Sequence, residues 1–282
     1  MTENLDILER IHAAYYQLTA SERKVSDYVL ACPDQIQYMS ISQVAEECGV
    51  AEATISRFCK NLGLKGFHSF KLEIAKHVAT TASTSKKNNN KQPKHNKLQR
   101  IGKNSKEAIQ QTIDLVDQSL IDKAIALIES SSTVVCMGSG GSMITAQECA
   151  HLFSTVCNKF FPVSDSHMQI SCTATMKTSD TIILFSYSGA TKNGIQILEL
   201  AKVRGIKTIL ITRFSKSPAA ELADIVLCCG SNETPFQFGS IPARVAQLVL
   251  LDVLYQEYVT HNQKTCDTAL NSIAMALTNM HI

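Results

Sequence analysis

Apolar residues recur at three- and four-residue spacing through the first 78 residues, and runs of β-branched residues are few there. This spacing places apolar side chains on one face of a helix. The pattern therefore predicts an all-α region over residues 1–78, made of short amphipathic helices that pack on one another.

From about residue 107 the pattern changes, because helical spacing alternates with short β-rich apolar runs. Such alternation predicts βαβ units and an α/β doubly wound parallel sheet over residues 107–282, with ligand sites at the carboxyl ends of the strands. The expected order is a helix over 108–129, strand 133–137, helix 143–157, a segment around 160–163, helix 167–176, strand 181–185, helix 193–203, strands near 208–211 and 225–227, and a long helix from about 241.

A polar segment from about Ala79 to Gly102 separates the two regions. It is rich in Thr, Ser, Lys and Asn and poor in apolar residues, which is typical of a flexible linker. We therefore expect a flexible basic linker over residues 79–106 between a helical domain and an α/β domain.

Two capping boxes mark helix starts in the first region. Thr19 and Glu22 predict one helix, which should end before Pro33, and Ser40 and Gln43 predict another. In each box a hydroxyl and a side-chain carbonyl or carboxylate satisfy backbone N–H groups that the first turn of a helix leaves unpaired.

A sharp turn at Gly49 separates the second of these helices from a third that starts near Glu52. The third helix has its expected inward face at Ile55, Phe58, Cys59 and Leu62. Two helices joined by a glycine turn, with a polar and basic outward face on the second, form a helix-turn-helix pattern that suits entry into a DNA major groove. The candidate DNA-contacting residues are Ala53, Thr54, Ser56, Arg57, Lys60, Asn61 and Lys65, with Lys71 as a further phosphate contact. An ordinary helical bundle with a polar surface helix is the alternative.

Charge is unevenly distributed along this chain of net charge +2. Residues 1–53 carry a net charge of −6, residues 54–103 of +11, and residues 104–282 of −3. A concentrated basic block on a nearly neutral protein indicates a polyanion partner. A solvated lysine-rich linker accounts for the second half of the block but not for the first.

Two Ser/Gly turns follow β-like runs in the second region, at 138–142 and 186–191. A strand, a glycine turn and a helix start together direct free N–H groups and the positive end of a helix dipole at one spot. Two such turns in one domain indicate a bound phosphate ester.

Dinucleotide binding is the competing interpretation of the first turn. It requires a third glycine where Met143 stands and an acidic residue at a strand end about twenty positions on. Asp165 does not fit that role, because Asp165-Ser166-His167 has the pattern of a helix cap. No Gly-Lys-Ser/Thr follows either turn, so a Walker loop is excluded.

The run 49–67, GVAEATISRFCKNLGLKGF, closely resembles the start of RpiR-type bacterial transcription regulators. That family joins a helix-turn-helix to a C-terminal SIS (sugar isomerase) domain, and the resemblance covers nearly the whole chain except the linker. It implies a regulator of sugar metabolism whose operator binding responds to a phosphosugar, acting as a homodimer or dimer of dimers on a palindromic operator. The ligand-binding residues that it implies are Ser139, Ser142, Ser186, Ser188, Gly189, Thr191 and Glu233. Gln237 departs from the family pattern, where an arginine is usual. This departure leaves open which sugar acid or sugar phosphate is bound.

A phosphosugar isomerase with an accessory helical domain is the second hypothesis, and a sugar-binding adaptor that touches no DNA is the third. An isomerase needs a positioned acid and base near the first carbons of the sugar. His151, His167 and Glu233 are the candidates, but none has a partner at clear catalytic spacing, and we expect His151 to be packed within its helix. We therefore expect no enzyme activity.

Ten cysteines lie mostly within apolar stretches and include no Cys-x-x-Cys pair. We expect them to be reduced, buried thiols, with no metal and no cofactor. No run of eighteen or more apolar residues is present, and the first residues lack an apolar signal segment, so we expect a cytoplasmic protein with no membrane partner.

Overall fold

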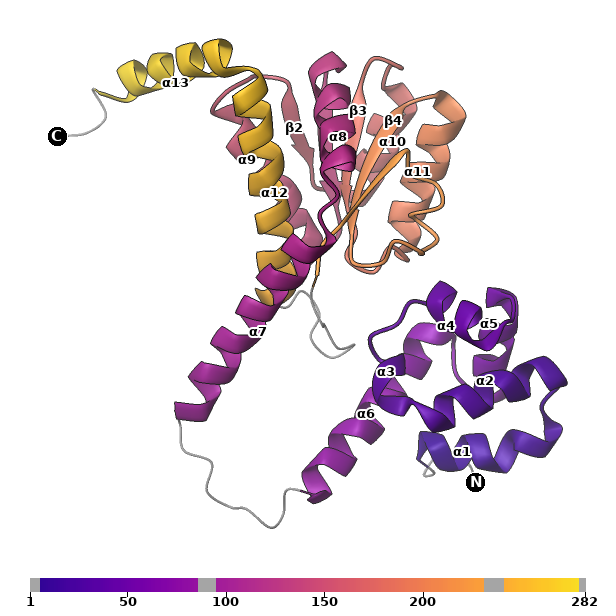
Figure 1. Ribbon diagram of the computed structural model, residues 1–282. Helices are drawn as coiled ribbons and strands as arrows, with labels where there is room; N and C mark the ends of the chain where they lie inside the picture. Colours follow the sequence, from indigo (N-terminus) through magenta and orange to yellow (C-terminus); the bar gives the residue numbers. More distant parts are fainter. Residues whose placement is uncertain (1–5, 86–94, 231–240, 279–282) are drawn as a thin grey trace. The chain divides into compact units, whose positions relative to one another are not determined.

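The structure is a computed structural model that describes residues 6–85, 95–230 and 241–278 (Figure 1). These residues form two compact units, one ending at Gly102 and the other beginning at Lys103. In the part of the chain so described, no helix has both the length and the apolar character needed to cross a membrane.

The first unit is helical throughout its described residues, as the apolar spacing predicted. It contains α1 (Ile7–Ala14), a short 3-10 turn (Tyr15–Gln17), α2 (Ala20–Ala31), α3 (Pro33–Ile36), α4 (Ile41–Cys48), α5 (Glu52–Asn61) and α6 (Phe67–Ser85).

Both predicted capping boxes are confirmed. At α2 the backbone N–H of Glu22 donates to the Thr19 hydroxyl over 3.3 Å, and the Glu22 carboxylate accepts from the Thr19 N–H at 2.9 Å. At α4 the same exchange joins Ser40 and Gln43 at 3.1 and 2.9 Å. Helix α2 ends at Ala31, ahead of Pro33 as predicted.

The core of the first unit forms where α5 packs against α2, α4 and α6. Ile55, Phe58 and Cys59 are fully buried, together with Val25 of α2 and Phe70 of α6. The rings of Phe58 and Phe70 meet edge to face with centroids 5.7 Å apart, which is a favourable aromatic geometry. The predicted inward face of α5 is thus confirmed.

The second unit is built on a five-stranded parallel sheet with strand order β2-β1-β3-β4-β5, which confirms the predicted doubly wound α/β layout. The strands are β1 (Val134–Gly138), β2 (Phe160–Val163), β3 (Thr181–Phe185), β4 (Lys207–Thr212) and β5 (Ile225–Cys228). Helix α7 (His95–Leu115) begins before the boundary at Lys103 and continues into this unit. The other helices are α8 (Gln118–Ser130), α9 (Gly141–Ser154), α10 (Ser166–Thr175), α11 (Lys192–Arg204), α12 (Ile241–His261) and α13 (Gln263–Leu277).

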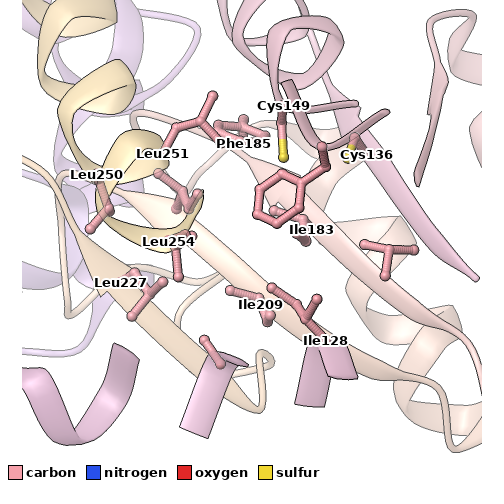
Figure 2. Packing of buried hydrophobic residues seen from close by; sticks show 14 of the residues in the cluster. Ile128, Cys136, Cys149, Ile183, Phe185, Ile209, Leu227, Leu250, Leu251 and Leu254 are labelled. Atoms are coloured by element: carbon pink, nitrogen blue, oxygen red, sulfur yellow. The ribbon is translucent and has the colours of Figure 1, made fainter. Parts of the chain in front are cut away.

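Helices cover both faces of this sheet, so alternate strand residues enter two separate cores. On one face Cys136, Ile183 and Ile209 pack against α8, α9 and α12, with Cys149 and Leu254 among the helix residues (Figure 2). On the other face a second cluster joins the sheet to α10 and α11. Burial on both faces explains why the strands are continuous apolar runs rather than alternating ones.

The prediction of a single helix over 108–129 is wrong, because α7 ends at Leu115 and α8 starts at Gln118. Asp117 causes the break: its carboxylate accepts the Ser119 N–H at 2.9 Å and caps α8. The long helix from about residue 241 likewise ends at His261, and α13 follows.

Helices also enter the segment expected to be a flexible linker. Helix α6 continues to Ser85, since residues 79–85 contain neither Gly nor Pro, and α7 begins at His95, two positions after Pro93. The domain boundaries 1–78, 79–106 and 107–282 themselves stay a prediction.

Candidate functional site

The turn between α4 and α5 has the geometry that its glycine predicted. Gly49 adopts the left-handed conformation at φ 60°, and its N–H bonds back to the end of α4. The hydroxyl of Ser42 donates to the Glu52 carboxylate at 2.5 Å, which ties the start of α4 to the start of α5. Backbone and side-chain contacts therefore fix the angle between the two helices.

Helix α5 presents the predicted DNA-contacting residues away from the core. The side chains of Arg57 and Lys60 are exposed, as is Ala53, and Lys65 is exposed in the turn that follows the helix. Thr54 and Ser56 are half-buried near the start of the helix. An exposed basic face next to short side chains is the arrangement that a groove-reading helix needs. The assignment of these residues to DNA stays a prediction.

Two of the predicted DNA-contacting residues also form hydrogen bonds within the first unit. Asn61 donates its side-chain amide to the Glu22 carboxylate at 2.7 Å, and so joins the end of α5 to α2. Lys71 donates to the carbonyl oxygen of Met39 at 2.9 Å. Both side chains therefore have structural partners within the unit, and a role in DNA binding stays a prediction for each.

In the second unit the two Ser/Gly turns leave the sheet side by side. Strands β1 and β3 are adjacent and parallel, and their register pairs Gly138 with Phe185. Helix α9 leads from β1 to β2 on one side, and α11 leads from β3 to β4 on the other. The turns thus stand where the strand order reverses, which is the ligand-binding position of open α/β sheets.

The first turn is compact enough to require glycine at the end of β1. A Cβ on Gly138 would stand 2.8 Å from the backbone carbonyl carbon of Ser142. Gly140 has φ 56° and precedes α9, and no side chain caps that helix. Ser139 is exposed and Ser142 half-buried. The N–H groups of Ser142 and Met143 donate within the turn to the carbonyl oxygens of Ser139 and Gly140, at 3.2 and 3.1 Å. The turn therefore offers a helix start without a side-chain cap and two small hydroxyls.

The second turn repeats these features. Ser186 is buried, and its hydroxyl lies 3.4 Å from that of Thr191. The Ser188 hydroxyl is exposed and accepts the Ala190 N–H at 3.3 Å. Gly189 has φ 60°, and Thr191 precedes α11 without capping it through its side chain. The first N–H groups of α11 therefore stand beside three hydroxyls.

This arrangement can hold a phosphate-sized anion. Two helix N-termini contribute partial positive charge and N–H donors, and serine and threonine hydroxyls contribute further donors. The structure brings the turn residues to one edge of the sheet. Glu233 and Gln237 lie outside the described residues.

Asp165 caps α10 by accepting the Met168 N–H at 2.8 Å, as predicted, so it does not serve as the acid of a dinucleotide site. The prediction that His151 is packed within its helix is wrong, because its side chain is exposed on α9. His167 is exposed as well.

All ten cysteines lie within the described residues and are free thiols. Cys48, Cys59, Cys136 and Cys149 are buried as expected, whereas Cys228 is half-buried. Burial raises the pKa of the Cys59 thiol to about 12 and that of Cys48 to about 11. These two thiols therefore stay protonated near neutral pH and act as small apolar groups.

A helix-turn-helix unit and an α/β unit with two Ser/Gly turns at one edge of its sheet together define a class, the DNA-binding regulators with a separate ligand domain. Residues 5–81 match the model of the helix-turn-helix domain of the RpiR family, and residues 127–256 match the SIS domain. An uncharacterized HTH-type transcriptional regulator of Clostridium perfringens is 35% identical over 258 residues, covering 90% of this chain and 92% of that relative. The chain belongs to the RpiR family of HTH-type transcriptional regulators, as the motif resemblance indicated.

Two solved structures share this fold. The Vibrio vulnificus NanR protein, complexed with ManNAc-6P, superposes with a TM-score of 0.87 at 21% identity and covers 98% of this chain and 99% of its own. The sugar isomerase domain of an RpiR transcription factor from Sphaerobacter thermophilus superposes with a TM-score of 0.56 at 20% identity, covering 62% of this chain and 97% of its own.

One feature of the α/β unit was not predicted from the sequence. The side chain of Gln169 in α10 lies between the ends of β1 and β2 and contacts Asn193 at the start of α11. A lone buried glutamine in a helix gives no local sequence signal of such a role.

Proposed function

We propose that this transcription regulator binds a phosphosugar at the two Ser/Gly turns and that the bound sugar changes its affinity for operator DNA. One observation carries the proposal. The register of β1 and β3 sets two uncapped helix starts, each with a glycine turn and hydroxyls, side by side at the switch point of the sheet. A phosphate ester satisfies such N–H groups with its oxygens.

Within this site we assign the phosphate to Ser139, Ser142, Ser186, Ser188 and Thr191, with Gly189 allowing close approach of the backbone. Glu233 is the proposed contact to the sugar itself. The similarity of fold to NanR, which is complexed with ManNAc-6P, supports a sugar phosphate as the class of ligand. Gln237, which stands where an arginine is usual in the family, is proposed to affect which sugar the site accepts.

On the DNA side, α5 enters the major groove and Arg57, Lys60 and Lys65 contact bases and phosphates. A homodimer presents two such helices to a palindromic operator in the cytoplasm, one to each half-site. Sugar and operator affinities are then coupled reciprocally, typically by about 1–3 kcal/mol.

No observation favours the isomerase hypothesis over this one. The two histidines considered as acid or base, His151 and His167, are exposed side chains. Incubating the protein with aldose and ketose phosphates and following their interconversion tests it directly. Turnover that Ser188→Ala abolishes would favour the enzyme.

The proposal itself is tested by operator binding with and without sugar phosphates. Genomic DNA selected by the full-length protein supplies the operator, and fluorescence anisotropy then measures affinity. The panel is ManNAc-6P, glucose 6-phosphate, fructose 6-phosphate and ribose 5-phosphate, each paired with its unphosphorylated sugar. We expect one phosphate ester to shift operator affinity by at least fivefold while its unphosphorylated partner has no effect. No shift with any member would refute the effector role.

A further inference from the structure

Gln169 is a fully buried side chain whose amide bonds three separate elements of the α/β unit. Its Nε2 donates to the carbonyl oxygens of Gly138 and Val163, both at 2.8 Å. Its Oε1 accepts from the side-chain amide of Asn193 at 2.6 Å. Both amide protons and the carbonyl oxygen are thus used.

The partners of Gln169 lie at the two Ser/Gly turns. Gly138 is the last residue of β1 and opens the first turn, while Asn193 is the second residue of α11, directly after the second turn. Val163 ends the neighbouring strand β2. One buried amide therefore connects the backbone of the first turn to the helix that the second turn opens.

These contacts fix the orientation of the amide as well as its position. Rotating it by 180° would aim N–H groups at the Asn193 donor and leave two carbonyl oxygens facing the Gln169 carbonyl. An unpaired buried polar group is costly, so the amide holds one orientation. A leucine at this place is of similar size but makes none of these three hydrogen bonds, and so would leave the two turns unconnected.

We propose that Gln169 and Asn193 form a positioning pair that sets the spacing of the two Ser/Gly turns for the bound phosphosugar. The inference rests on the proposed function, because it concerns how the same site is held. Hydrogen bonds weaken steeply beyond their narrow range of distances, so donors on two turns can serve one phosphate only if the turns are held at the right separation.

The test compares Gln169→Leu, Asn193→Ala and the double variant with the wild-type full-length protein. A matched control is Thr173→Val, which removes another buried hydrogen bond of α10, from Thr173 to the carbonyl oxygen of Gln169, without touching either turn. Titration calorimetry measures the Kd of the panel member that binds the wild type most tightly. Operator affinity without sugar and thermal unfolding are recorded for each variant.

We expect Gln169→Leu to weaken sugar binding at least tenfold and Asn193→Ala at least threefold. The double variant should bind within about twofold of Gln169→Leu, since the pair acts as a unit. Thr173→Val should bind sugar within twofold of wild type even if its unfolding temperature falls. Operator affinity without sugar should stay within twofold for all four, which a general loss of folded protein would not allow.

A wild-type protein that binds sugar while Gln169→Leu and Asn193→Ala bind it equally well overturns the positioning role and leaves the proposed function intact. The same conclusion follows if Thr173→Val weakens binding as much as Gln169→Leu. If Gln169→Leu does not fold, Asn193→Ala decides alone, because Asn193 is only half-buried. A wild-type protein that binds no member of the panel overturns both proposals.

Discussion

Gly189 and Ser217 stand so close that no side chain fits between them: a Cβ on Gly189 would lie 2.0 Å from the Ser217 Oγ. Ser217 is fully buried, and the carbonyl oxygen of Gly189 accepts the Ala219 N–H at 2.9 Å. The segment after β4 therefore packs directly against the second turn.

Gly189→Ala should lower the free energy of unfolding of the α/β unit by about 3 kcal/mol, because overpacking adds to the strain of a positive φ. Sugar phosphate binding should be lost with it. Gly205→Ala is the matched control at the other end of α11. Gly205 has φ 70°, but an added Cβ would lie 3.5 Å from its nearest neighbour, so we expect the free energy of unfolding to fall by only about 1 kcal/mol. Denaturant unfolding measures both, and equal losses would contradict the packing argument.

Arg57→Ala should weaken operator binding by about 1–3 kcal/mol while sugar binding stays unchanged. The exposed side chain lies on the outward face of α5, so its loss should not affect folding. If Arg57 contacts a phosphate, the slope of log affinity against log salt should also fall by about one. Lys264→Ala, an exposed positive charge on α13, is the control and should have neither effect.

Asn61→Ala should lower the stability of the helical unit by about 2 kcal/mol, because it leaves the Glu22 carboxylate, which is only 2% exposed, without one of its partners. Thermal unfolding tests this, with the exposed Asn271→Ala on α13 as control. Operator affinity, measured well below the unfolding temperature, should fall less than for Arg57→Ala. A larger fall would assign Asn61 mainly to DNA.

Features that depend on neighbouring residues could be predicted from the sequence. The capping boxes at Thr19 and Ser40 and the left-handed Gly49 are set by residues at most four positions apart. The strands of the buried sheet are short apolar runs, and β3 was expected over the residues it occupies, 181–185. The helix caps, the glycine turn and the strand therefore depend on residues close together in the sequence.

Two features were missed for different reasons. The break before α8 is local, since Asp117 accepts the N–H of Ser119 two positions on, but a helix cap within a long helical pattern gives a weak sequence signal. The role of Gln169 depends on three elements that only the fold brings together. The exposure of His151 can be read from the apolar spacing of α9. The buried face of α9 includes Ala146, Ala150 and Phe153, at three- and four-residue spacing, and His151 falls outside that spacing.

Cys59 should make the helical unit sensitive to alkali. Its thiol has an ordinary pKa of 9.0 and a pKa of about 12 in the fold, because burial disfavours the thiolate. The contribution of the protonated thiol to the free energy of unfolding is therefore fully present below pH 9. It is lost as the pH rises from 9 towards 12, by at most about 1.4 kcal/mol per pH unit. The stability difference between wild type and Cys59→Ala should shrink from pH 8 to pH 11 in denaturant titrations. A constant difference would contradict this.

Ser188→Ala should weaken the response to sugar phosphate roughly tenfold, because it removes one exposed hydroxyl donor from the second turn. Stability should change by less than about 0.5 kcal/mol, since the only partner found for the hydroxyl among the described residues is the Ala190 N–H at 3.3 Å. Operator binding without sugar should be unchanged. Ser171→Ala, an exposed serine on α10, is the control for removing a surface hydroxyl. Loss of operator binding by a well-folded Ser188→Ala would show that the second turn serves DNA binding directly and that the two units do not act as separate modules.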